Sequence, residues 1–341
     1  MLRKLKDTFV QILFTLLSLY LTFLLLRYPA RSLDYAGTGL LLWFRKMIPT
    51  LFPFMILSGV MVRMNLTENF ARFFHPLFHK IWGTSLNGSY VILMGMLCGF
   101  PMGARVVGEL CRAGKLSEEE GAYLLAFCNN IGPIYFLSFV TGALSLSGCL
   151  PFLIMYGVPL CYGVFLHLLG CPRIRTRCPV PAFHTGSLST KASRSAVFLA
   201  ASLAKPARPS LLAAIDDSIV SGLIGIGKLG GYMVFFNLLN ILFLPFASPA
   251  GGLAGNPLSG SFPALCNCLL EITSGISRVG KEGGYMVLIL LPFGGLSCMA
   301  QTYSMIKGTN LSISRYFLHK SIQTAATALI YAFCAAFSYT L

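Results

Sequence analysis

Apolar runs close to 20 residues long recur along this chain and limit what it can fold into. A bilayer core about 30 Å thick is crossed by about 20 residues of α-helix. Runs near that length lie at 8–28, 40–62, 89–111, 118–147, 151–169, 218–246, 264–282, 285–306 and 316–340. Because unsatisfied backbone groups are costly in lipid, such runs must form helices. The sequence therefore predicts an all-α, polytopic membrane protein.

The composition supports this class and excludes a nucleic-acid partner. Of the 341 residues, 55% are apolar and only 11% are charged, about half the charged share of a soluble domain. The net charge is +15, but the basic residues gather at the N-terminus and in the segments between apolar runs. Cytoplasmic loops of membrane proteins carry this excess of Lys and Arg. We therefore expect a lipid bilayer around the chain and no nucleic acid.

Enzyme signatures are missing or out of context. The 11 cysteines are scattered through apolar runs without a CxxC pair, and the five histidines show no metal-ligand spacing. The sequence at 225–230 matches GxGxxG, but no strand precedes it and no βαβ unit surrounds it. We expect no catalytic residue, no metal and no cofactor, and therefore not an enzyme.

Charge and apolar pattern divide the chain into four parts. Residues 1–35 predict an N-terminal transmembrane anchor, since the run after the basic N-terminus lacks a small-residue cleavage site. Residues 36–170 form a first half and residues 211–341 a second half. The linker at 171–210 holds seven Lys or Arg and no acid, which places it in the cytoplasm. This topology leaves Lys320 on the outside.

Several apolar runs are interrupted by Gly and Pro, at 99–103, 129–133 and 292–295. At an offset of about 195 residues, the break at 99–105 falls on 295–301, and the flanking segments correspond. With the linker in the cytoplasm, the two halves enter the membrane from opposite sides. The pattern predicts two inverted-repeat halves, each with a broken helical hairpin.

Inverted halves with broken helices are typical of secondary transporters, because a break exposes N–H and C=O groups that bind a solute or ion. The alternative is that Gly and Pro only permit kinks and close helix packing. We favour a transporter or permease of a small polar solute. The candidate solute-binding residues are Gly99, Pro101, Gly103, Arg105, Asn129, Asn130, Gly132, Pro133, Glu271, Thr273, Ser274, Gly294, Gly295, Ser297 and Gln301.

Arg105 is the most informative of these residues, because a cation near the bilayer centre is usually paired or functional. Its planar guanidinium matches a carboxylate and suits an anionic solute, helped by the helix N-terminus at Pro101–Gly103. Alternatively, Arg105 pairs with Glu109 one turn further on or extends to lipid headgroups. Both readings follow from the sequence.

The other polar candidates also have two readings. Asn129 and Asn130 either orient the solute or satisfy the broken helix. Glu271 either carries a coupling proton or sodium ion, or pairs with Arg105 or Arg278. Ser297 and Gln301 either complete a two-sided site or bond across helices.

Four motifs resemble a known family. The segments at 99–105, 128–133, 270–273 and 293–301 are similar to those of YlbJ-type sporulation integral membrane proteins, which carry the nucleoside-recognition or "Gate" domain. The resemblance covers roughly residues 36–340, so both halves would be Gate-like. It implies a multi-pass protein of the cell membrane in an endospore-forming bacterium, in the outer forespore membrane. It also implies that the solute is dipicolinate, moved into the developing spore.

Two alternatives to dipicolinate transport stay open at this point. One is a nucleoside-type transporter. The other is a non-transporting membrane scaffold needed for spore formation, in which the polar candidates would be replaceable without a phenotype. Assembly into a homo-oligomer is compatible with each.

Overall fold

The structure is a computed structural model that describes residues 2–146, 148–170, 210–246, 257–280 and 284–337. All regular elements within these ranges are helices, and no strand is among them. This confirms the predicted all-α class. Almost all of the predicted linker at 171–210 lies outside the described residues, and its placement in the cytoplasm stays a prediction.

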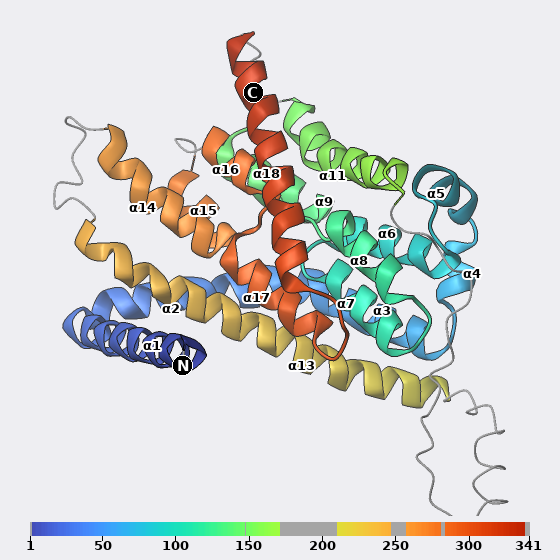
Figure 1. Ribbon diagram of the computed structural model, residues 1–341, viewed down its shortest axis with the longest axis horizontal. Coiled ribbons are helices and arrows are strands. Elements are labelled where there is room, and N and C mark those ends of the chain that lie inside the picture. The colour runs from blue at the N-terminus through green and yellow to red at the C-terminus, as the bar shows by residue number, and fades with distance from the viewer. Residues whose placement is uncertain (1, 147, 171–209, 247–256, 281–283, 338–341) are drawn as a thin grey trace, which may run out of the picture.

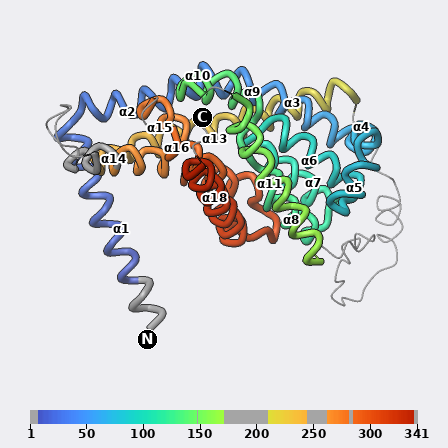
Figure 2. The backbone as a smooth tube through the Cα atoms, turned by 90° about the horizontal axis from the view of Figure 1, so that it is seen from above, coloured from blue at the N-terminus to red at the C-terminus, as the bar shows by residue number. Residues whose placement is uncertain are grey.

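The N-terminal helix α1 (Leu2–Arg27) projects away from the rest of the molecule (Figure 2). Its large apolar side chains, such as Phe14 and Leu26, are exposed. Its span from Thr8 to Arg27 is long and apolar enough to cross a membrane. An apolar helix with so little protein around it needs lipid as its surroundings, as expected for a transmembrane anchor.

Two long helical segments lie side by side along one edge (Figure 1). The first comprises α2 (Pro29–Leu42), the π-helical turn η1 (Trp43–Met47) and α3 (Ile48–Arg63). The second comprises α13 (Leu211–Leu238) and the 3₁₀ segment η3 (Leu239–Phe246). Glycine permits their close approach, since a Cβ on Gly39 would lie 2.8 Å from the Met233 carbonyl oxygen.

The first half continues with two short helices, which are followed in the chain by two helices that are each interrupted by a break. Helices α4 (Thr67–Ala71) and α5 (His75–Trp82) precede α6 (Leu86–Cys98), which is bent 94° from α5. Helix α6 ends at a break before α7 (Met102–Arg112). Helix α8 (Glu118–Cys128) ends at a second break before α9 (Pro133–Tyr135), η2 (Phe136–Val140) and α10 (Thr141–Leu144). Helix α11 (Leu150–Leu168) closes this half.

The second half repeats this arrangement of broken helices. Helix α14 (Pro257–Leu270) breaks at Glu271 before α15 (Ile272–Val279). Helix α16 (Gly284–Leu290) breaks at residues 291–294 before α17 (Gly295–Ile306). The last helix, α18 (Ile313–Ala336), follows. The interruption at Glu271 was not among the predicted breaks, because no Gly or Pro marks it.

The breaks cross each other in pairs, with backbone against backbone. At the first crossing, formed by residues 99–101 and 129–132, Gly99 has φ +81° and a Cβ there would run into the backbone of Gly132. At the second crossing, formed by Glu271 and residues 291–294, a Cβ on Gly295 would lie 3.1 Å from the Cys268 carbonyl oxygen. Phe100 of the first crossing lies against Gly294 of the second.

The order of elements aligns the halves differently from the sequence offset. In chain order, the α6–α7 break corresponds to the α14–α15 break at Glu271, and the α8–α9 break corresponds to the α16–α17 break. The predicted offset of about 195 residues instead pairs the first break with the fourth, because both contain Gly next to small residues. The inverted relation between the halves stays a prediction.

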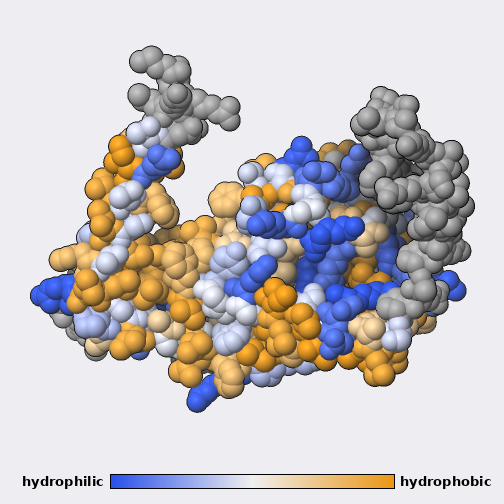
Figure 3. All heavy atoms as spheres, turned by 90° about the horizontal axis from the view of Figure 1, so that it is seen from below, coloured by the Kyte–Doolittle hydropathy of each residue, from blue (hydrophilic) through white to orange (hydrophobic). Residues whose placement is uncertain are grey.

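Six helical segments among the described residues are long and apolar enough to span a membrane, or seven if the bent α5–α6 pair counts as one span. Helix α18 is not one of them; its first half carries Arg315, His319 and Lys320. Figure 3 shows hydrophobic residues over much of one face and along α1, with hydrophilic residues gathered in one part of that face. The chain is thus a multi-pass membrane protein.

The first crossing predicts a severe effect for a single added methyl group. Gly99→Ala forces an L residue into positive φ and against Gly132, so we expect its Tm in detergent to fall by roughly 5 °C or more. Gly227→Ala is the control, because a Cβ at this exposed helical position meets nothing within 4 Å. Its Tm should stay equal or rise slightly. Equal Tm values for the two variants would contradict the crossing.

Candidate functional site

A cavity of about 60 Å³ lies where the two crossings meet, and we call it the central cavity. Three of the four breaks contribute to its wall through Phe100, Gly132 and Glu271, and helix α17, which follows the fourth break, contributes Gln301. Most of the remaining wall is apolar and includes Leu51, Phe54, Leu229 and Met233 of α3 and α13. A space of this size accommodates a few water molecules or a small ion. It is therefore a polar pocket inside an apolar shell.

Among the described residues that line the central cavity, Glu271 is the only one with a carboxylate, and it is 1% exposed. It begins α15 as the N-cap residue: Oε1 accepts the Thr273 N–H at 3.2 Å and Oε2 accepts the Ser274 N–H at 2.7 Å. An anionic cap at a helix N-terminus is stabilised by these free N–H groups. The break at Glu271 therefore forms because the side chain replaces the backbone acceptors that α14 no longer supplies.

The expected ion pairs of Glu271 are not formed. Arg105 pairs with Glu109, with Nε 2.9 Å from Oε1, and Arg278 lies 3.8 Å from Asp34. Among the residues that the structure describes, these are the two ion pairs. The buried carboxylate of Glu271 therefore has hydrogen-bond donors but no cationic partner there.

Gln301 faces the central cavity from the first turns of α17. Its Nε2 donates to Ser297 Oγ at 3.0 Å, one turn earlier in the same helix. Both residues are buried. The contact is within one helix, so the expected bond across helices is not the one formed, and the amide oxygen of Gln301 stays available to a solute.

Asn129 forms a hydrogen bond with a backbone group freed at the first crossing and links this crossing to the second half. Its Oδ1 accepts the Ala104 N–H at 3.3 Å, near the N-terminus of α7. Its Nδ2 donates to Thr302 Oγ1 at 3.0 Å and to Tyr316 Oη at 2.9 Å. All polar atoms of the Asn129 amide are therefore engaged within the protein, which supports the structural reading of this residue.

Asn130 leads to a buried cation that the sequence analysis did not expect. The ammonium of Lys320 donates to Asn130 Oδ1 at 2.6 Å and to Gln323 Oε1 at 3.2 Å. Lys320 is fully buried within the protein. The sequence shows the lysine, but its burial depends on the amide oxygen that the first crossing supplies together with that of Gln323.

The Lys320 cluster also compensates the end of a broken helix. Asn130 Nδ2 donates to the Phe127 carbonyl oxygen at 2.5 Å, and Gln323 Nε2 donates to the Ala126 carbonyl oxygen at 2.6 Å. Both carbonyls belong to the last turn of α8. A helix C-terminus carries partial negative charge, so a cation there is favourable. The first crossing thus contains its own cation.

Lys320 lies between two aromatic rings that face different cavities. Its Nζ is 5.4 Å from the ring centroid of Phe100, which lines the central cavity, and 5.8 Å from that of Tyr316. Tyr316 lines a second, open cavity of about 840 Å³ together with Glu118, Glu119 and Arg315, which we call the vestibule. The first crossing therefore separates the vestibule from the central cavity.

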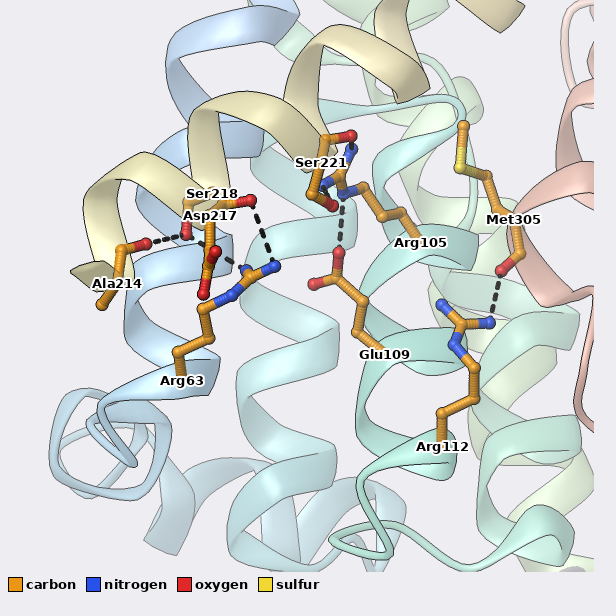
Figure 4. Close-up of polar contacts among 9 residues, drawn as sticks. All are labelled: Arg63, Arg105, Glu109, Arg112, Ala214, Asp217, Ser218, Ser221 and Met305. Carbon is orange, nitrogen blue, oxygen red and sulfur yellow. Dashed lines mark hydrogen bonds and ion pairs between the residues drawn. The ribbon is translucent and has the colours of Figure 1, made fainter. Parts of the chain in front are cut away.

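Arg105 belongs to a separate polar cluster on α13. Its Nη2 donates to Ser221 Oγ at 3.0 Å, while its Nε holds Glu109 (Figure 4). Arg105 is not part of the central cavity wall. The predicted contact with Glu109 is confirmed, and the guanidinium that was to meet an anionic solute is occupied by protein groups.

Two more arginines tie neighbouring helices in the same region (Figure 4). Arg63 Nη1 donates to Ser218 Oγ at 3.1 Å, joining α3 to α13. Arg112 Nη1 donates to the Met305 carbonyl oxygen at 3.0 Å, joining α7 to the end of α17. Arginine suits this role, because its planar fork makes several hydrogen bonds while it stays charged.

The structure divides the predicted site residues into three groups. Four line the central cavity: Gly132, Glu271, Thr273 and Gln301. Ten build the crossings or lie beside them: Gly99, Pro101, Gly103, Asn129, Asn130, Pro133, Ser274, Gly294, Gly295 and Ser297. Arg105 of α7 lies apart, against α13. Sequence reasoning missed Lys320, Gln323, Thr302 and Tyr316 on α17 and α18, because their partners at or beside the first crossing are far away in the chain.

These features define a class: a multi-pass integral membrane protein whose broken helices cross around a buried polar pocket. The chain is similar to the sporulation integral membrane protein YlbJ of Bacillus subtilis (strain 168). The two are 24% identical over an alignment of 341 residues, which covers 91% of this chain and 79% of YlbJ. This confirms the resemblance to YlbJ-type proteins. No family model matches the chain, and no solved structure matches it.

The buried ammonium of Lys320 predicts that its removal lowers the unfolding free energy, and that a side chain with a hydrogen-bond donor restores part of it. Lys320→Met keeps the length of the side chain but leaves Asn130 Oδ1 and Gln323 Oε1 without their donor, so we expect a loss of about 1–3 kcal/mol in unfolding free energy for each orphaned group. The variant Lys320→Gln should lose less than Lys320→Met, since its amide N–H groups can still donate to one of these oxygens.

Thermal unfolding in detergent measures both Lys320 variants. Lys307→Met is the matched control, because Lys307 is exposed and its removal should leave the Tm unchanged. A Lys320→Met variant as stable as the control would show that the ammonium is not buried among these amides.

Proposed function

We propose that this protein transports a small polar solute across a membrane. The observation that carries the proposal is the meeting of helix breaks from both halves at one cavity with polar groups. Breaks at membrane depth persist only where protein or a water-filled cavity satisfies the freed groups. Such an arrangement, in two similar halves, is the way secondary transporters build a site near the midplane.

The two cavities support an alternating-access mechanism. The central cavity and the vestibule lie on either side of the Lys320 cluster, with Phe100 facing one and Tyr316 the other. A solute would pass from one cavity to the other when the crossings move relative to the apolar wall formed by α3 and α13. The site provides for binding and passage, and we assign no catalytic step to it.

The central cavity is too small for an organic solute in this conformation, so we infer that it widens during transport; its lining then suits an aromatic solute with hydrogen-bonding groups. Phe100 and Tyr135 offer rings for stacking, while Gln301 and Thr273 offer amide and hydroxyl groups. Dipicolinate and nucleosides both have this combination. Since the similar YlbJ is named a sporulation protein, we place dipicolinate first, and the outer forespore membrane as the location.

An anionic solute raises an electrostatic requirement. Two negative charges in a poorly screened pocket repel each other by several kcal/mol at an effective dielectric near 20. Because Glu271 already lines the cavity, an anion binds there only if a proton or cation neutralises this carboxylate. The proposal therefore implies that a cation is carried along with a dianion such as dipicolinate.

The transport proposal predicts saturable uptake of radiolabelled dipicolinate into proteoliposomes that contain the full chain. Gln301→Leu keeps a similar volume but removes the amide that faces the central cavity, so the apparent affinity should weaken roughly 3- to 10-fold, the value of one or two hydrogen bonds. The exposed variant Lys307→Met should transport like the parent.

Arg105→Ala distinguishes a binding role from a packing role. Since Arg105 is held by Glu109 and Ser221, we expect a lower Tm with little change in apparent affinity. A large loss of affinity at unchanged Tm would instead show that Arg105 takes part in solute binding. If folded protein takes up neither dipicolinate nor nucleosides, the transport proposal fails and the scaffold function replaces it.

A further inference from the structure

The second crossing buries a negative charge that nothing in the described part of the chain neutralises. Glu271 is 1% exposed and takes part in neither ion pair there. Backbone N–H groups of Thr273 and Ser274 hold its two oxygens. These donors stabilise the charged form of the carboxylate, but they do not cancel its charge. An isolated buried charge is costly, so a counter-charge is expected.

An unpaired acceptor lies beside this carboxylate, on Asn237 of α13. Asn237 is fully buried, and its Nδ2 donates to the Met233 carbonyl oxygen at 2.8 Å and contacts Glu271 Oε2 at 3.5 Å. These two contacts fix the orientation of the amide, because the opposite orientation would set oxygen against two oxygens. Its Oδ1 is then a buried acceptor without a donor among the described residues.

Two further amide oxygens lack a donor within the residues that the structure describes: that of Asn240, about one turn after Asn237, and that of Asn267, about one turn before Glu271. Asn240 follows Asn237 at the start of η3, and Asn267 precedes Glu271 in α14. The Oδ1 atoms of both are buried, and the described residues offer them no donor. Buried acceptors without partners are rare in native proteins, and each calls for water or an ion.

We propose that Glu271 and the Asn237 oxygen beside it form a site for one monovalent alkali cation, with the oxygens of Asn240 and Asn267, one turn away in the chain, as further candidate ligands. Oxygen atoms are the ligands that such hard cations prefer. A single carboxylate among neutral amides matches one positive charge, whereas Ca²⁺ sites use several carboxylates. The central cavity reaches Glu271 and gives the ion space for bound water.

At the first crossing, amide oxygens bind a cation that belongs to the chain itself, the ammonium of Lys320. There the ammonium of Lys320 bonds to the oxygens of Asn130 and Gln323. The second crossing has a carboxylate and amide oxygens but no lysine. The inference rests on the proposed transport function only for the role of the ion, which would neutralise Glu271 when an anionic solute binds.

The site is tested without any solute, by thermal unfolding of the full chain in detergent. NaCl replaces choline chloride at constant ionic strength, and a parallel series uses KCl. We expect a saturable rise in Tm of roughly 2–4 °C with at least one of the two alkali ions. Glu271→Gln should abolish the rise, because the amide keeps an acceptor for the backbone N–H groups but carries no charge.

Glu109→Gln is the matched control, since this second carboxylate already has Arg105 as its cation; the rise should persist. If Glu271→Gln fails to fold, Asn237→Leu takes its place and should abolish or strongly weaken the rise. A Tm that is independent of alkali ions, or an equal rise in Glu271→Gln, overturns the site. Stabilisation by acidification alone also overturns it, in favour of a proton on Glu271. Because uptake is not measured, these outcomes are independent of whether dipicolinate is the solute.

Discussion

The structure depends on how backbone groups freed at four helix breaks are satisfied within a membrane. Each such group costs several kcal/mol in lipid if it stays unpaired. Asn129 satisfies the start of α7, Glu271 that of α15, and the amides of Asn130 and Gln323 the end of α8. The polar residues in these runs therefore have a structural task before any solute is considered. Binding groups are those left over, such as the amide oxygen of Gln301.

The two crossings differ in charge although their geometry is similar. Lys320 places a cation at the C-terminus of α8, and Glu271 places an anion at the N-terminus of α15. Each charge is of the sign that the adjacent helix end favours. The difference lies in access, because Glu271 lines the central cavity whereas Lys320 does not. The cation of the first crossing is part of the chain, while the cation that we propose at the second crossing could exchange through the cavity.

The helical class and three of the four breaks could be predicted, since apolar run length and the Gly–Pro interruptions are local features of the sequence. The break at Glu271 could not, because it depends on a side chain that caps a helix rather than on a helix-breaking residue. The burial of Lys320 depends in part on the amide oxygen of Asn130, which is 190 residues away in the chain. Arg105 was singled out as unusual, and its partner Glu109 was local and therefore predictable.

Close backbone contact restricts the motions open to such a fold. At the first crossing Gly99 lies on Gly132, and at the second Gly295 lies on the end of α14. Backbones in contact without side chains between them cannot slide without creating voids or clashes. Each crossing must therefore move as a unit. The wall formed by α3 and α13 meets the cavity mainly through apolar side chains such as Leu51 and Leu229, and α13 is tied to the broken helices by the contacts of Ser221 with Arg105 and of Asn237 with Glu271. Apolar contacts re-form more easily after a displacement than hydrogen bonds, so a movement of this wall has to break only these few polar contacts.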